Sequence, residues 1–310
     1  MLFITGPAFG QSRAEDLILA GHWKQARSIV QAHLSQSPGD PLSNYLLSQI
    51  SHAFGDDVSP RPLAEKAVAL DGTVAKYHRQ LAEVVGIEAQ HASPFRLVFL
   101  AHQFRGELDT AISLDPRDIQ AQRDLLEYYL VAPGIAGGDV KKAAAVAQHI
   151  AEMDPAEGFL AKARVAAFRR HDAETAALLV ESAGVLPPSY KARAELAKFY
   201  LAPGHSNPAG AENAAKEMLK LDRTRVEPWS ALAEIYAERE DWSDLEATLT
   251  AASQQVPDDL APYYQAAAAL LRTGHDPARA ERYLRVYLEH EPEGNEPTLA
   301  DARRKLTQKR

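Results

Sequence analysis

The chain has 310 residues, of which 46% are hydrophobic and 25% charged, so it can build a packed core and is not disordered along its whole length. Its formal net charge is −8 and its pI is about 5.8, which argues against a nucleic-acid-binding protein because such proteins usually carry a basic face. It has no cysteine, which excludes disulfides, thiolate metal sites and thiol nucleophiles.

The first ten residues, MLFITGPAFG, are almost wholly apolar, and polar sequence begins at Gln11. Ala8 and Gly10 are small residues that suit a cleavage after Gly10, which is typical of the end of a secretory signal peptide without its basic start. We interpret residues 1–10 as a signal-peptide remnant, which predicts a periplasmic or otherwise exported protein. The alternative is an apolar extension that packs on the first repeat, with a cytoplasmic protein as the consequence.

A short motif recurs along the chain: an apolar residue followed by Asp-Pro or a variant of this dipeptide. Equivalent positions are 38, 72, 116, 155, 188, 223, 257 and 292, so the steps are 34, 44, 39, 33, 35, 34 and 35 residues. Five of the seven steps lie within one residue of 34, which fits two helices of about 12 to 15 residues and two short turns. The period predicts a repeated helix-turn-helix unit. The first copy is weak but keeps the turn Gly21-His22-Trp23.

The 44-residue step predicts a lengthened helical hairpin over about residues 73–114. Ser93 and Pro94 are typical of an N-cap and a first helical residue, and the helix from Phe95 to Leu114 is too long for a regular unit. We expect the two helices to share the ten extra residues. The start of the second helix, PFRLVFL, is apolar almost all round, so it is either covered by neighbouring helices or exposed to a partner.

The 39-residue step contains an extended turn, APGIAGG, at residues 132–138, and Asp139 is the expected N-cap of the following helix. A related turn, APGHSNPAG, begins at Ala202. Their glycines are not followed by Gly-Lys-Ser or Gly-Lys-Thr and no strand precedes them, so they do not predict a nucleotide site.

The most regular unit spans residues 226–257. Its two helices carry apolar stripes at helical spacing, and the residues concerned are Trp229, Leu232, Ala233, Tyr236, Leu245, Leu249 and Ala252. Pro257 then ends the unit, because proline cannot continue a helix interior.

This pattern resembles the tetratricopeptide repeat family, with Leu245 in place of the alanine that the family has there. Small residues let the two helices of a unit approach closely, and stacked units supply the core. The resemblance implies an all-α fold, a right-handed α-solenoid of about eight helix-turn-helix repeats over residues 11–296. A stack needs a polar cap, and we predict a C-terminal capping helix over residues 297–310, with an inner stripe of Leu299, Ala302 and Leu306.

In this family the first helix of each unit lines a groove. We transfer the groove positions of the family to this sequence and add the apolar start of the hairpin helix. The predicted partner-binding residues are then Lys76, Arg79, Phe95, Val98, Phe99, Arg123, Glu127, Lys162, Lys198 and Glu234. The charge of the groove would be mixed or positive in its middle and negative towards its C-terminal end. The alternative is that these charges only keep the protein soluble. Glu83 and Glu127 replace the asparagines of a carboxylate clamp, so a clamp is not expected.

No pattern predicts catalysis, a cofactor or a metal site. His78, His91 and His102 near the hairpin are separated by 13 and 11 residues, which fits no ligand motif, and we interpret them as helix-surface histidines. No nucleophile elbow and no kinase signature occurs. We expect a protein that is not an enzyme and needs no cofactor.

The sequence predicts a non-catalytic scaffold that binds a protein or peptide partner through the groove, the hairpin or both. We expect neither nucleic-acid binding nor a membrane span. Two alternatives stay open. One is a structural protein that self-assembles into a homo-oligomer through its apolar hairpin. The other is an accessory subunit of an enzyme or envelope complex.

Overall fold

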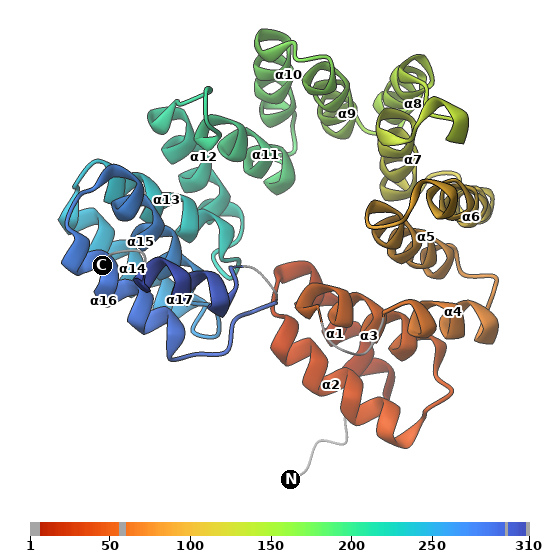
Figure 1. Cartoon of the computed structure of the whole chain (residues 1–310), viewed down its shortest axis with the longest axis horizontal. Helices are drawn as coiled ribbons and strands as arrows, with labels where there is room; N and C mark the ends of the chain where they lie inside the picture. The colour runs from red at the N-terminus through yellow and green to blue at the C-terminus, as the bar shows by residue number, and fades with distance from the viewer. Residues whose placement is uncertain (1–6, 56–59, 295–296, 308–310) are drawn as a thin grey trace. The chain divides into compact units, whose positions relative to one another are not determined.

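The computed structural model describes residues 7–55, 60–294 and 297–307, with side chains from Gln11 onward. In these residues the chain forms seventeen α-helices, one short 3-10 helix and no strand (Figure 1). The helices are α1 (Pro7–Ala20), α2 (Trp23–Gln36), α3 (Pro41–Phe54), α4 (Pro60–Leu70), α5 (Ala75–Gln90), α6 (Pro94–Leu114), α7 (Ile119–Val131), η1 (Gly134–Ala136), α8 (Val140–Met153), α9 (Pro155–Phe168), α10 (Asp172–Gly184), α11 (Tyr190–Leu201), α12 (Pro208–Leu221), α13 (Glu227–Glu238), α14 (Trp242–Gln255), α15 (Ala261–Thr273), α16 (Pro277–Leu288) and α17 (Leu299–Thr307). The sixteen helices from α1 to α16 make eight consecutive pairs, which confirms the predicted all-α repeat architecture.

Contacts among its residues divide the chain into two units. The first comprises Met1–Glu15, as far as it is described, and Gln25–Ser189, and the second comprises Asp16–Lys24 and Tyr190–Arg310. Within each unit the two helices of a pair pack together, as α3–α4 and α11–α12 do, and neighbouring pairs also touch, as α13 and α15 do. Because a pair cannot bury its own apolar face, stacking supplies the core, as in an α-solenoid.

In the first unit, small residues set how closely the helices approach. A Cβ on Gly158 of α9 would lie 2.3 Å from the Cα of Ala151 on α8, so these backbones meet at a point where only glycine fits. Ala143 and Ala147 of α8 are buried in the same contact, and Ile150 is fully buried beside them. The alanine-rich composition is therefore used for close helix packing.

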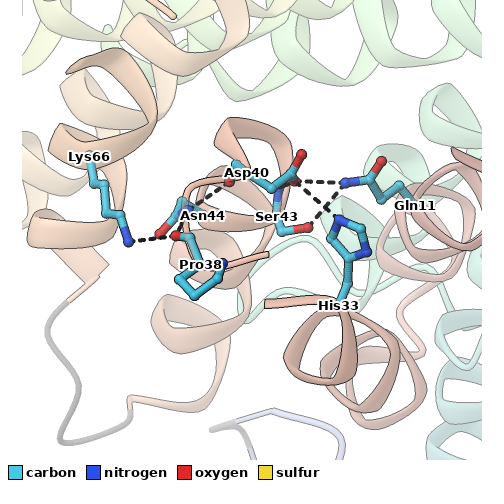
Figure 2. Close-up of polar contacts among 7 residues, drawn as sticks. All are labelled: Gln11, His33, Pro38, Asp40, Ser43, Asn44 and Lys66. Atoms are coloured by element: carbon cyan, nitrogen blue, oxygen red, sulfur yellow. Dashed lines mark hydrogen bonds and ion pairs between the residues drawn. The ribbon is translucent and has the colours of Figure 1, made fainter. Parts of the chain in front are cut away.

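The turn before α3 is held by polar contacts around Asp40 (Figure 2). Asp40 caps α3 by accepting a hydrogen bond from the Ser43 backbone N–H at 2.7 Å, and Gln11 Nε2 donates to the same carboxylate oxygen at 2.7 Å. Lys66 Nζ of α4 donates to the carbonyl of Pro38 at 2.7 Å. Side chains from α1, α3 and α4 thus meet at one turn and hold the first two repeats together.

The second unit has the most regular core, and both stripes predicted for residues 226–257 are buried. The residues concerned are Trp229, Leu232, Ala233, Tyr236, Leu245, Leu249 and Ala252. The indole of Trp229 also donates to the carbonyl of Arg223 at 3.0 Å. At the end of this unit, Ala302 of α17 is fully buried and Leu299 and Leu306 pack on the same core, so the predicted inner stripe of the capping helix is confirmed.

The lengthened hairpin is present as α5 and α6, and both helices are longer than the others, but α6 takes the larger share of the extra length. Helix α6 has 21 residues and α5 has 16, while the other α-helices have between 9 and 14. Ser93 occupies the N-cap position and Pro94 follows it, yet the Ser93 side chain makes no capping hydrogen bond. Most of the insertion therefore extends α6 at its N-terminal end, where the apolar segment PFRLVFL lies.

At the N-terminus, α1 begins at Pro7, so the predicted cleavage point after Gly10 falls inside this helix. Residues 1–6 and the side chains of residues 7–10 lie outside the described part of the chain, as do residues 308–310 of the predicted cap. Among the described helices, none is both long and apolar enough to cross a bilayer.

Candidate partner-binding surface

Lys76 and Arg79, two of the predicted basic residues in the first unit, are ion-paired. Lys76 Nζ lies 2.5 Å from Glu15 Oε1. Arg79 NH1 of α5 lies 3.7 Å from Asp124 of α7, and its Nε lies 3.8 Å from Asp118. These contacts reduce the basic charge that the sequence placed in the middle of the groove.

The same pattern continues along the stack. Arg123 of α7 lies 3.7 Å from Glu157 of α9, and Glu127 of α7 accepts two hydrogen bonds from Arg164, at 2.8 and 2.6 Å. Lys162 is half-buried on α9. The ion pairs join α5 to α7 and α7 to α9, so the structure brings the predicted groove positions side by side.

Two predicted residues belong to the second unit. Lys198 of α11 is exposed, and Glu234 of α13 accepts a hydrogen bond from Arg272 of α15 at 2.8 Å. Burial raises the pKa of the Glu234 carboxyl, and Arg272 opposes that shift. Both residues line a pocket of about 700 Å³ within this unit.

The apolar start of α6 is only partly covered. Phe95 is 93% exposed and Phe99 is 67% exposed, whereas Val98 is half-buried and Leu100 is buried. Of the two alternatives that the sequence left open, exposure therefore holds for the two phenylalanines. Spaced four residues apart, Phe95 and Phe99 lie on one face of the helix and form an exposed apolar strip.

A second face of α6 lines a pocket of about 610 Å³, which we call the hairpin pocket. Leu97, Ala101 and Phe104 face it from α6, and Ile87 faces it from α5. Residues two positions apart differ by about 200° around a helix, so Leu97 and Ala101 lie roughly opposite Phe95 and Phe99. The long helix thus presents one apolar face to the pocket and another to solvent.

The wall of the hairpin pocket is shaped by two close aromatic contacts. Phe104 stacks on Tyr128 of α7 with ring centroids 5.5 Å apart and planes at 10°. A Cβ on Gly86 of α5 would lie only 3.0 Å from Phe104 Cδ2, so glycine is what lets this ring lie against α5. The Tyr128 hydroxyl donates to the carbonyl of Ala136, which fixes the extended Ala-Pro-Gly turn beside the pocket. Residues of the hairpin and of the inserted turn therefore build one site.

Three carboxylates line this pocket, those of Glu83, Asp124 and Glu127, together with the polar side chains of His52, Gln90 and Tyr128. Among the described lining residues there is no lysine or arginine, but Arg79 interacts with Asp124 and Glu83, and Arg164 donates two hydrogen bonds to Glu127. Burial raises the pKa of Asp124 to about 6; Arg79 opposes the shift and Glu83 adds to it. The pocket can hold an apolar side chain and favours a positive charge at its edge.

The pocket of the second unit combines similar groups on regular helices. Its apolar lining includes Ala197, Leu201, Met218 and Ala231, and its carboxylates are Glu195, Glu227, Glu234, Asp259 and Glu293. Lys198 is the cation among the described lining residues. Desolvation raises the pKa of Asp259, so part of this acidic charge is also held out of water.

Sequence reasoning missed several of these residues. Leu97, Ala101 and Phe104 have the i, i+4, i+7 spacing of a helix face, a signal that could have been used, but nothing local shows that Tyr128 and Asp124 lie opposite them. One interpretation was wrong. His78 is 8% exposed, and its ring lies 2.7 Å from Glu107 and 3.0 Å from the Gly72 carbonyl, so it is not a surface histidine.

Paired helices stacked in series, with pockets formed between neighbouring pairs, define a helical-repeat protein. Among solved structures, the chain is similar to a tetratricopeptide repeat protein of Thermus thermophilus, TTC0263, at 17% identity and TM-score 0.53, over 62% of this chain and 98% of that one. It is also similar to yeast Tom70, at 13% identity and TM-score 0.63, over 97% of this chain and 62% of that one. No protein-family model and no curated protein matches the sequence. The chain has the tetratricopeptide repeat fold, as its repeats predicted.

Proposed function

We propose that the chain is a non-catalytic scaffold that binds a protein partner, and that the hairpin pocket is its main contact in the first unit. The partner would supply an extended segment with an apolar side chain for the pocket and a lysine or arginine for its acidic edge. The observation that carries this proposal is the combination of apolar walls with three lining carboxylates and no lining lysine or arginine among the described residues.

Each part of this surface has a defined role in recognition. The apolar wall formed by Leu97, Phe104 and Val131 would remove the partner's side chain from water. Glu83, which lines the pocket and interacts electrostatically with Arg79, would accept the partner's positive charge. Charge complementarity of this kind sets orientation and selects against acidic partners.

The exposed strip of Phe95 and Phe99 gives the same partner a second contact, but it also supports one rival. Two copies of the chain could bury their strips against each other, which would make the protein a self-assembling structural component. Sedimentation at increasing protein concentration separates these two functions. A monomer at every concentration favours the scaffold, and a dimer abolished by Phe95→Asp with Phe99→Asp favours self-assembly.

A displayed library of random peptides, selected on the purified full chain, tests the pocket directly. We expect enrichment of peptides with an apolar residue next to lysine or arginine. Val131 lines the pocket and is 60% exposed, so Val131→Arg adds a positive charge there without disturbing the core. This variant should weaken binding of an enriched peptide at least about tenfold, because like charges are brought together.

Ile135→Arg is the matched control. Ile135 is 83% exposed, lies four residues further on and does not line the pocket, so it receives the same new charge outside the site. Equal loss of binding in both variants would point to a general charge effect. Enrichment of acidic peptides, or full binding by Val131→Arg, would contradict the proposal.

The proposal also includes export. The apolar residues 1–10 with Ala8 and Gly10 support cleavage after Gly10. A mature chain starting at Gln11 would keep the side chain that hydrogen-bonds Asp40 and Ser43. Cell fractionation of the native host with N-terminal sequencing tests this; recovery from the cytoplasm with residues 1–10 intact would contradict it.

A further inference from the structure

A cluster of three potential ligand side chains, none of which the sequence analysis singled out as a ligand, lies in the second unit. His22 lies in the turn between α1 and α2, Asp258 between α14 and α15, and Glu293 after α16. One ligand atom from each lies within 4.8 Å of the others. Among the described residues this is the one group of three or more histidine, aspartate or glutamate side chains with such spacing.

The segment that carries His22 is firmly attached to the two C-terminal turns. His22 Nδ1 lies 3.2 Å from Asp258 Oδ2. The backbone N–H of Lys24 donates to Glu293 Oε2 at 2.8 Å, and Lys24 Nζ donates to the carbonyls of Asp258 and Glu291 at 2.6 and 2.8 Å. The imidazole of His22 also hydrogen-bonds the backbone of Thr224. The three side chains are therefore held in place before any ligand arrives.

The cluster leaves one buried ligand atom without a partner. Glu293 is 8% exposed, and no N–H or hydroxyl group of a described residue donates to its Oε1, while the Asp258 carboxyl group lies beside it. Two carboxylates this close repel each other and have lost most of their water, which is unfavourable unless a proton or a cation neutralises one of them. The Lys24 ammonium group does not fill that place, because its bonds go to backbone carbonyls.

We propose that His22, Asp258 and Glu293 form a binding site for a divalent transition-metal cation, with Zn²⁺ as the best match. Imidazole nitrogen together with carboxylate oxygen is a ligand set that zinc accepts, whereas magnesium and calcium prefer oxygen alone. The Thr224 contact would orient the His22 ring, as hydrogen bonds behind metal-binding histidines do. The bound ion would link the turn at Gly21–Lys24 to the turns at 256–259 and 289–293 of the same unit.

This inference does not rest on the proposed peptide binding, so its test is separate. The full chain is treated with a chelator and titrated with Zn²⁺ at pH 7.5 by calorimetry, with Mg²⁺ and Ca²⁺ as comparison cations. We expect one Zn²⁺ per chain, at least about tenfold preference over Mg²⁺ and Ca²⁺, and a higher melting temperature with Zn²⁺. Glu293→Gln and His22→Asn should each weaken the site at least about tenfold, since each removes a ligand.

The matched control is His33→Asn. His33 Nε2 lies 3.9 Å from Asp40 Oδ2 in the first unit (Figure 2). Among the described residues, no third histidine or carboxylate side chain joins this pair to form a possible metal site. It should leave Zn²⁺ binding unchanged. The proposal is overturned if the wild-type chain binds no Zn²⁺ under these conditions, or if His22→Asn and His33→Asn affect binding equally. Should Glu293→Gln unfold by circular dichroism, Asp258→Asn replaces it with the same expected loss.

Discussion

The long hairpin of the first unit and the regular repeats of the second use the same helix-turn-helix plan with different results. In α13 the large residues Trp229, Leu232 and Tyr236 are all buried against neighbouring helices. In α6, which is 21 residues long, Phe95 and Phe99 extend beyond what the neighbouring helices cover. The comparison teaches that a helix lengthened within a stack gains surface that the stack does not need, and this surface is available to a partner.

The two pockets differ in origin in the same way. The hairpin pocket depends on the long α6, the close approach at Gly86 and the inserted turn held by Tyr128. The pocket of the second unit is lined mainly by helices of ordinary length. We therefore expect selectivity to reside in the hairpin pocket.

The largest contrast is in stability. Leu245 is fully buried in the regular second unit, so Leu245→Ala should lower the free energy of unfolding by about 2–5 kcal/mol. Phe99→Ala removes a larger side chain that is 67% exposed, and it should change the free energy of unfolding by less than about 0.5 kcal/mol. Urea denaturation followed by circular dichroism measures both. A cost for Phe99→Ala similar to that for Leu245→Ala would show that the strip is part of the core.

A pH effect on binding should separate the hairpin pocket from a purely apolar one. Asp124 has a pKa of about 6, so it is a carboxylate at pH 7.5 and mostly protonated at pH 5. A peptide with a basic residue binds the anionic form better, so its affinity should fall about tenfold, or 1.4 kcal/mol, as the pH drops through that range.

Asp124→Asn should weaken binding at pH 7.5 and flatten this pH profile. A peptide in which norleucine replaces the basic residue is the control, because it carries no charge to interact with the carboxylates. Equal affinity of the basic peptide at pH 5 and pH 7.5 in the wild-type chain would contradict the assigned role of Asp124.

The inserted turn should contribute a smaller, local effect. Tyr128→Phe removes the hydroxyl that donates to the Ala136 carbonyl and leaves that carbonyl without this donor. We expect a loss of about 1 kcal/mol in unfolding free energy and faster hydrogen exchange confined to residues 132–138. Tyr283→Phe is a matched control, because the Tyr283 hydroxyl donates to Glu246 in the second unit. This variant should leave hydrogen exchange in residues 132–138 unchanged.

The smallest effect should come from the second pocket. Glu234→Gln keeps the shape of the side chain and removes the charge that pairs with Arg272. A peptide selected on the hairpin pocket should retain its affinity within about twofold, because Glu234 belongs to the other unit. Fluorescence anisotropy would measure this. A larger loss would show that the peptide also occupies the second pocket.

Much of the local structure followed from sequence signals with a direct physical cause. The 34-residue period gave the paired helices, and the buried stripes of residues 226–257 followed from helical spacing. Asp139 caps α8 as expected, accepting hydrogen bonds from the backbone N–H groups of Lys141 and Lys142. The site was predicted less completely than the local structure. Groove positions indicate which residues lie side by side, but they do not show which charges neutralise each other.

The repeat unit, the helix type and the location of the irregular hairpin could be predicted from local sequence, because turn residues and apolar spacing act over a few residues. The pairing of Arg79 with Asp124, the stacking of Phe104 on Tyr128 and the exposure of Phe95 became visible in the folded chain alone. So did the contact of His22 with Asp258, 236 residues further along the chain. Such contacts depend on how pairs stack, and no local pattern records which distant side chains the stacking brings together.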